Sequence, residues 1–161
     1  LIERVGSNQI LLQNEINKLV SYQPQITKDS INVMCELLPQ TSVFQLLDAA
    51  FAGRATEVEK IYKEQRAQKV EPQQIIGMIA WQLQILAIVK ASGSTNADTI
   101  AKDAKLNPYV VKKSMSLAHN LTLAKIKELI ANALVLDITL KSKPVDADQA
   151  LQNYLLKIAI F

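Results

Sequence analysis

The longest charge-free segment is the feature that most constrains the fold. It runs from Pro72 to Val89 without Asp, Glu, Lys or Arg, which is long enough for a membrane-spanning helix. Four glutamines interrupt the segment, and neither an aromatic belt nor a basic flank frames it. The segment therefore predicts a buried central helix in a soluble helical bundle, with no membrane partner.

Composition favours the same fold class. The 161 residues are 49% hydrophobic and 5% aromatic, with 4 Gly and 5 Pro. This hydrophobic content excludes a disordered chain, and so few turn residues and aromatics disfavour strands. We predict an all-α chain of about nine helices without a strand, because apolar residues recur at helical spacing.

Breakers and caps place the expected helices. Gly6 ends a short first segment, Ser7 is expected to cap the next helix, and Thr27 to cap another. That third helix has the apolar stripe Ile31, Met34, Cys35 and Leu38. Residues 39–42 are the expected domain boundary. Later helices are expected at 43–51, 57–69, 72–90, 96–106, 108–119, 122–140 and from a cap at Asp146 to the end. Because the chain opens inside an apparent helix, we expect it to be part of a longer protein.

Residues that could support catalysis are scarce. The glycines are isolated, so no phosphate-binding loop is expected. His119 is the single histidine and Cys35 the single cysteine, which leaves no catalytic triad and no metal set. Cys35 lies on an apolar stripe and is read as a core residue, and Asp137 is expected to pair with a Lys of a neighbouring helix. We predict no catalytic residue, no cofactor and no metal, and therefore not an enzyme.

The formal net charge is +3, with the excess of Lys after residue 92. Such a balance is weak for a dedicated duplex-DNA binder, which neutralises several phosphates at once. One segment, 95–115, is nevertheless similar to a helix-turn-helix and carries Lys102, Lys105, Lys112 and Lys113. A DNA-binding protein that uses this segment is the alternative function. Two packed helices with solvated lysines are the simpler interpretation.

The order of several short motifs resembles one family. The motifs are Asn14-Glu15-Ile16-Asn17-Lys18-Leu19, Val43-Phe44-Gln45-Leu46-Leu47-Asp48-Ala49, Ile79-Ala80-Trp81-Gln82-Leu83-Gln84-Ile85-Leu86, Asn107-Pro108-Tyr109-Val110-Val111-Lys112-Lys113, and Leu136-Asp137 with Leu140-Lys141-Ser142 and Ala150-Leu151. In this order they are similar to the C-terminal half of the bacterial DNA polymerase III delta subunits, which belong to the replicative clamp loader. Trp81 and Gln84 depart from the pattern, since the family commonly has Arg there, and Gln152 stands near its usual Glu.

The resemblance implies an architecture and partners. Residues 1–40 would be the end of an AAA+-type helical lid, and residues 41–161 a helical collar that joins the tau/gamma and delta-prime subunits. The sliding clamp would be bound through an N-terminal domain outside this chain, and primed DNA would be held in the assembled cytoplasmic complex. The family member is not itself an ATPase, so no catalytic residue carries over.

Two groups of residues are candidates for contacts in such an assembly. The helices at 72–90 and 122–140 are apolar over more than one stripe, which exceeds what a single core requires. Leu123, Ile126, Leu129, Ile130 and Leu134 are therefore candidates for either the core or a subunit interface. Lys141 and Lys143, expected in a loop, are candidates for facing DNA.

Overall fold

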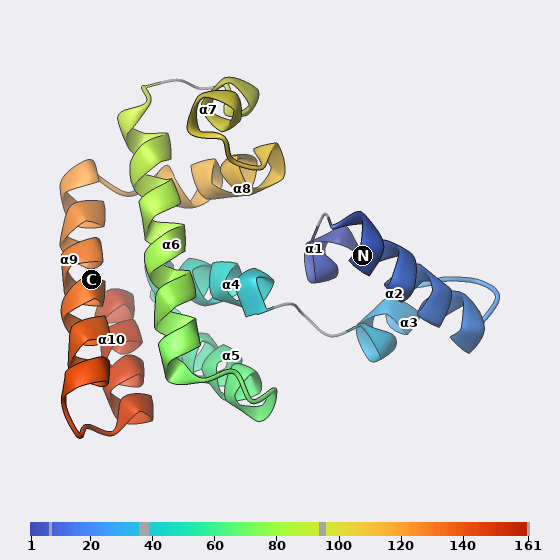
Figure 1. Ribbon diagram of the computed structural model, residues 1–161, viewed down its shortest axis with the longest axis horizontal. Helices are drawn as coiled ribbons and strands as arrows, with labels where there is room; N and C mark the ends of the chain where they lie inside the picture. The colour runs from blue at the N-terminus through green and yellow to red at the C-terminus, as the bar shows by residue number, and fades with distance from the viewer. Residues whose placement is uncertain (7, 36–38, 94–95, 161) are drawn as a thin grey trace.

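The computed structural model describes residues 1–6, 8–35, 39–93 and 96–160, and within these ranges it contains helices and no strand. The helices are α1 (Ile2–Val5), α2 (Gln9–Tyr22), α3 (Lys28–Met34), α4 (Pro39–Phe51), α5 (Ala55–Ala67), α6 (Pro72–Ala91), α7 (Ala97–Ala104), α8 (Pro108–Ala118), α9 (Leu123–Ser142) and α10 (Ala147–Ile160). Figure 1 shows their order in space. The predicted all-α class is confirmed, and the ten helices within the described ranges agree with the expected number of about nine.

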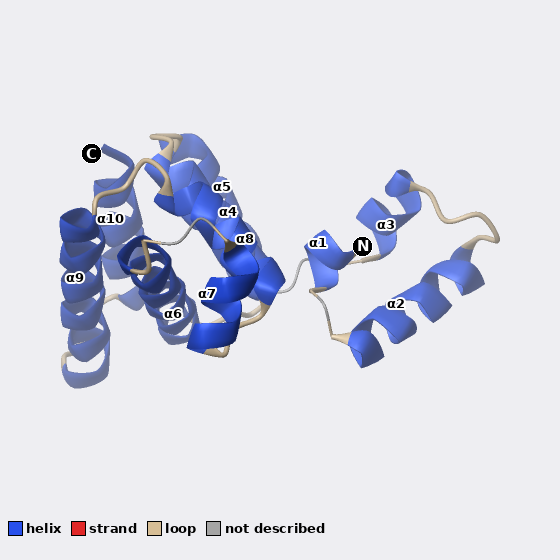
Figure 2. Cartoon of the chain, turned by 90° about the horizontal axis from the view of Figure 1, so that it is seen from above, coloured by secondary structure: helices blue, strands red, loops and turns tan. Residues whose placement is uncertain are grey.

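The buried side chains form two separate hydrophobic clusters. The larger cluster is built from α4 to α10, while the smaller consists of Val5, Leu19 and Cys35 in the α1–α3 region. Figures 1 and 2 both show α1, α2 and α3 standing apart from the remaining helices. Burial of Cys35 agrees with its assignment as a core residue.

The central helix is α6, as the charge-free segment predicts. Its residues Ile75, Ile76, Ile79, Leu83 and Leu86 are fully buried, and α4, α8, α9 and α10 pack around it. By length and composition it is the one helix in the described ranges that could cross a membrane. Its most apolar side is covered by the chain's own helices, which accounts for the hydropathy without a membrane.

Local chemistry explains where most helices begin. Asn8, Thr27, Asn96, Asn107 and Thr122 each accept hydrogen bonds from the first free N–H groups of the helix that follows. Pro72 occupies the first turn of α6, where its missing N–H costs no hydrogen bond. The Asp146 carboxylate accepts a hydrogen bond from Gln149 N, so the predicted cap of α10 is confirmed.

Two expected helix starts differ from the structure. Asn8 caps α2 in the role expected for Ser7, which lies outside the described residues, as does Leu38 of the expected stripe. The helix expected from residue 43 begins earlier, since α4 starts at Pro39 and Ser42 is buried in it. A proline that stops one helix can also start the next, and sequence alone does not distinguish the two roles.

A polar network fastens α10 to α5. The Tyr62 hydroxyl donates to Asp148 Oδ1 at 2.7 Å, and Arg66 Nε donates to the same oxygen at 2.8 Å. Arg66 Nη1 also donates to the carbonyl of Val70 at 2.8 Å. The hydrogen bond from Tyr62, followed by that from Arg66, lowers the pKa of Asp148 even though burial opposes the shift. Asp148 therefore stabilises the fold as a carboxylate.

Candidate subunit interface

The structure separates the five apolar candidates of α9 into core and surface. Ile126 and Leu129 are buried in the larger cluster, so they stabilise the chain itself and are not available to a neighbour. Leu123 and Ile130 are half-buried. Leu134 is 56% exposed, and it is the one candidate whose side chain is mostly open to a partner.

Two further apolar residues lie near Leu134. Val135 is 64% exposed and Ile138 is 54% exposed, and with Leu134 they form what we term the α9 stripe. Scattered apolar side chains are normal on a surface, whereas three close together on one helix make this surface a candidate for contact with a partner. The buried positions 126, 129, 133 and 140 define the core face of α9 and leave Val135 and Ile138 outside it, a division that the sequence alone did not provide.

Near the end of α9, the partner of Asp137 and the position of Lys141 differ from those expected from the sequence. Lys141 Nζ lies 2.6 Å from Asp137 Oδ2, so Asp137 pairs with a Lys of its own helix and not of a neighbouring one. The reason is geometric, since residues four apart share a helix face. Lys141 lies in the last turn of α9 rather than in a loop, while Lys143 caps the helix end and is exposed.

A groove follows the seam between α9 and α10. It has a volume of about 540 Å³, and Val135, Leu136, Ala150 and Tyr154 provide its apolar lining. The Tyr154 hydroxyl donates to the backbone carbonyl of Leu129 at 3.1 Å, which holds the aromatic ring in place. Val135 belongs to both the α9 stripe and this groove, so the two features are continuous.

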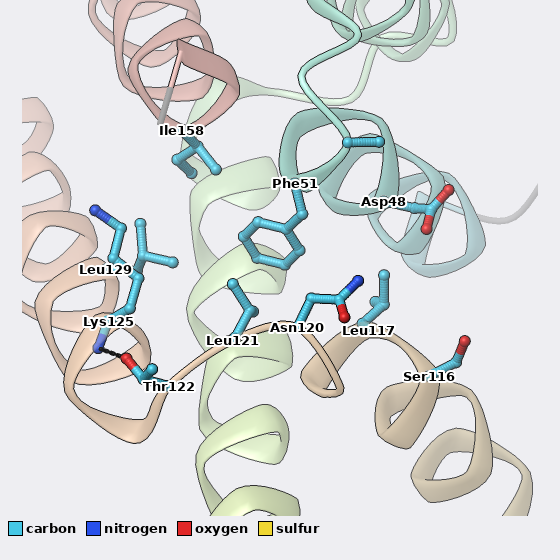
Figure 3. Close-up of a pocket in the computed structure, with 11 residues that line it drawn as sticks. Asp48, Phe51, Ser116, Leu117, Asn120, Leu121, Thr122, Lys125, Leu129 and Ile158 are labelled. Carbon is cyan, nitrogen blue, oxygen red and sulfur yellow. Dashed lines mark hydrogen bonds between the residues drawn. The ribbon is translucent and has the colours of Figure 1, made fainter.

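A second groove of about 500 Å³ lies where α4, α8, α9 and α10 meet. Figure 3 shows the ring of Phe51 directed toward Leu121 and Ile158, with Asp48 and Ser116 on one side. Thr122 Oγ1 accepts a hydrogen bond from Lys125 N at 3.1 Å, which fixes the start of α9 beside the groove. The lining shares Lys125, Leu129 and Ile158 with the first groove, so the two openings adjoin.

The helix-turn-helix candidate consists of α7 and α8. The two helices pack together, and Lys105 at the turn has a left-handed backbone conformation. At the start of α8, Val111 is fully buried, while Tyr109 is partly exposed. Lys102, Lys105 and Lys112 are exposed, and Lys113 Nζ lies 4.9 Å from the centre of the Phe44 ring. This geometry agrees with two packed helices that carry solvated lysines.

The metal-ligating and nucleophilic residue types in the described ranges are dispersed. No three His, Cys, Asp or Glu side chains in those ranges are placed to hold a metal ion. Burial, assisted by the hydrogen bond with Glu15, raises the pKa of the Cys35 thiol, which keeps it in the unreactive protonated form. His119 ends α8 on the surface, where its Nδ1 lies 2.9 Å from Asn120 Oδ1.

An all-helical domain with an exposed apolar stripe and adjoining grooves is typical of a helical association domain. Comparison with known proteins identifies the family. The family model described as the C-terminal domain of the DNA polymerase III delta subunit matches residues 40–158. The chain therefore belongs to the DNA polymerase III delta subunit family.

Two individual proteins are similar to this chain. The DNA polymerase III subunit delta of Bacillus subtilis (strain 168) is 24% identical over 163 residues, which covers 98% of this chain and 47% of that protein. The solved structure of the Bacillus subtilis DNA clamp loader delta protein superposes with a TM-score of 0.93 at 22% identity, covering 99% of this chain and 49% of that chain. The chain thus spans about half the length of the relatives that it matches.

Proposed function

We propose that this chain is the C-terminal part of a clamp-loader delta subunit and that its helices α4–α10 join it to the other loader subunits. The observation that carries the proposal is the α9 stripe, which lies inside the segment matched by the family model. Three exposed apolar side chains on one helix lose contact with water when a neighbouring helix covers them, and this burial favours association.

The proposed partners are the tau/gamma and delta-prime subunits. The sliding clamp would be bound by an N-terminal domain that is not part of the 161 residues, and primed DNA would be held by the assembled loader in the cytoplasm. In this role the chain supplies packing surfaces and no catalytic group. Binding and opening of the clamp would then depend on geometry that the assembly imposes.

The proposal keeps the two domains expected from the sequence. Residues 1–40 would be the end of a helical lid, and residues 41–161 would be a collar. The two separate hydrophobic clusters support this division, because each part has its own buried residues. α3 ends at Met34 and α4 begins at Pro39, so the start of α4 lies close to the proposed boundary at residue 40.

Co-elution tests the proposal directly. The chain is mixed with purified tau/gamma and delta-prime subunits and analysed by size-exclusion chromatography with light scattering. We expect a defined hetero-oligomer, which Leu134→Lys together with Ile138→Lys disrupts because two charges would be buried without partners. Val33→Lys is the matched control, since Val33 is equally apolar and is 72% exposed on α3. Persistent elution as a lone monomer beside competent partners would refute the collar role.

Contact between Lys141 and Lys143 and the DNA is a separate part of the proposal. Both lysines are exposed at the end of α9, although Lys141 already pairs with Asp137. We expect Lys141→Glu with Lys143→Glu to weaken DNA binding by the assembled loader and to reduce its salt dependence. Lys127→Glu, on the exposed surface of the same helix, is the control. Unchanged salt-dependent binding by the double variant would show that these two lysines do not contact the DNA.

A further inference from the structure

The exposed side of α9 has the residue spacing by which one helix packs along another. From Ala124 onward, its outward residues follow one another at intervals of three, four, three, four and three, and each of them is exposed. Such alternation of three and four keeps the side chains on one line and is the spacing of paired helices. We term these residues the α9 seam: Ala124, Lys127, Ala131, Leu134, Ile138 and Lys141.

The α9 seam lies on an open side of the molecule. Figures 1 and 2 both show α9 at one edge of the larger helical unit, with α6 and α10 on its inner side. The face that α9 turns towards these two helices is its buried one, with Ile126, Leu129 and Ala133. A second helix can therefore lie along the α9 seam.

The sizes of the seam residues fit a second copy of the same seam. In an antiparallel pair about a two-fold axis, the first seam residue lies opposite the last, the second opposite the fifth, and the third opposite the fourth. Ala131 then lies opposite Leu134 of the second copy, so a small side chain faces a large one on both sides of the axis. A parallel pair would place Ala131 opposite Ala131, which leaves a gap.

Charge favours the same arrangement. In the antiparallel pair, Lys127 lies beside Asp137 of the second copy. Lys127 has no ion pair within the part of the chain that the structure describes, and Asp137 binds Lys141 through Oδ2 at 2.6 Å. Oδ1 of Asp137 can therefore accept a hydrogen bond from Lys127 Nζ, and the two-fold axis forms this contact twice. A parallel pair would instead set each lysine of the seam against its own copy, which like charge opposes.

We propose that the α9 seam pairs with the α9 seam of a second copy of this chain, antiparallel about a two-fold axis. The second copy covers Leu134 and Ile138, so it occupies the α9 stripe and excludes another partner from it. The exchange of partners rests on the proposed function, since a loader subunit then replaces the second copy when the loader assembles. One helix from each copy gives a small interface, so we expect a weak dimer that dissociates on dilution.

Sedimentation equilibrium of the full 161-residue chain, over a range of concentrations, measures the self-association. We expect a monomer–dimer equilibrium that Lys127→Glu and Asp137→Lys each weaken about tenfold or more, because each change creates two like-charge contacts. An equimolar mixture of the two variants should recover the dimer, since opposite charges then meet at both contacts. With one variant isotopically labelled, native mass spectrometry identifies the mixed dimer.

Two more variants separate the pairing from general effects of charge and folding. Lys102→Glu, on the exposed surface of α7, is the matched charge reversal and should leave the dimer unchanged. Ala131→Arg should abolish the dimer, because the larger side chain does not fit opposite Leu134. Ala131 is exposed, so thermal melting followed by circular dichroism should show that this variant is folded.

The outcomes distinguish the self-association from the proposed function. A chain that stays monomeric at every concentration overturns the pairing; if it still binds the loader subunits through Leu134 and Ile138, the collar role stands. A dimer that the charge variants leave unchanged, or a mixture without mixed dimer, overturns the antiparallel arrangement. If the dimer forms as expected but competent loader subunits are not bound, the proposed function fails and the self-association stands. If loader subunits bind without reducing the dimer fraction, the second copy does not cover the α9 stripe.

Discussion

Removal of the Asp148 carboxylate is expected to destabilise the larger helical unit by about 2 kcal/mol at neutral pH. The carboxylate accepts hydrogen bonds from Tyr62 and Arg66 at 2.7 and 2.8 Å, and the side chain of Tyr62 is almost fully buried. Asp148→Ala leaves the buried Tyr62 hydroxyl without its partner, which costs about 1–3 kcal/mol. The ion pair with Arg66 adds only about 0.5 kcal/mol, because the Asp148 side chain is 44% exposed and solvent screens it.

The assay is urea unfolding followed through the fluorescence of Trp81, which lies in α6 and reports on this unit. A double-mutant cycle with Tyr62→Phe isolates the pairwise hydrogen-bond energy. Asp103→Ala, at an exposed carboxylate of α7, is the control and should change stability by less than about 0.5 kcal/mol. Equal midpoints for wild type and Asp148→Ala, or strict additivity with Tyr62→Phe, would refute the reasoning.

The same contact predicts a pH dependence with a definite sign. Because the folded-state pKa of Asp148 is lowered, its contribution is fully present above the unfolded-state pKa. The contribution is lost as the pH falls through the lower folded value, so the difference between wild type and Asp148→Asn should shrink below about pH 4. A difference that is constant from pH 7 to pH 3 would contradict the assigned cause.

Three further predictions concern the core and one turn. Ile79→Ala, at a fully buried position of α6, should cost about 3–4 kcal/mol in urea unfolding, whereas Ile138→Ala on the surface should cost less than about 1 kcal/mol. Gln82 Nε2 donates to the buried Ser114 hydroxyl at 2.8 Å, so Ser114→Ala should cost about 1–2 kcal/mol, and a compensating Gln82→Leu should recover part of the loss. Lys105→Gly should stabilise the chain by about 0.5–1 kcal/mol, because Lys105 has φ 53° at the end of α7; an unchanged melting temperature would contradict this.

The fold was largely predictable because its strongest signals are local. The charge-free run and Pro72 were sufficient to place the start of α6 and its burial, since both depend on residues close in sequence. The cap of α2 shows the limit of this local reasoning, because Asn8 fills the role that was expected for Ser7. Ser7 and Asn8 are both residue types that favour an N-cap, and the sequence alone does not say which of two adjacent candidates begins the helix.

The candidate interface was less predictable because burial depends on which helices meet. Ile126 and Leu134 were equivalent in sequence, since both are apolar residues of one long helix. The packing of α6 against α9 buries the former and leaves the latter exposed, and no local pattern specifies that side. Asp137 illustrates the opposite case, because its partner Lys141 was four residues away and was recognisable from helix geometry alone.

Because the two hydrophobic clusters are separate, we expect the α1–α3 unit to unfold locally while the larger unit stays folded. Among the residues that the structure describes, the α1–α3 unit buries the hydrophobic side chains of Val5, Leu19 and Cys35, whereas the larger cluster extends over seven helices. So small a core offsets little of the conformational entropy lost when three helices are ordered. The amide protons of α2 should therefore exchange with solvent through a local opening that leaves α6 folded, so a single free energy of unfolding does not describe the whole chain.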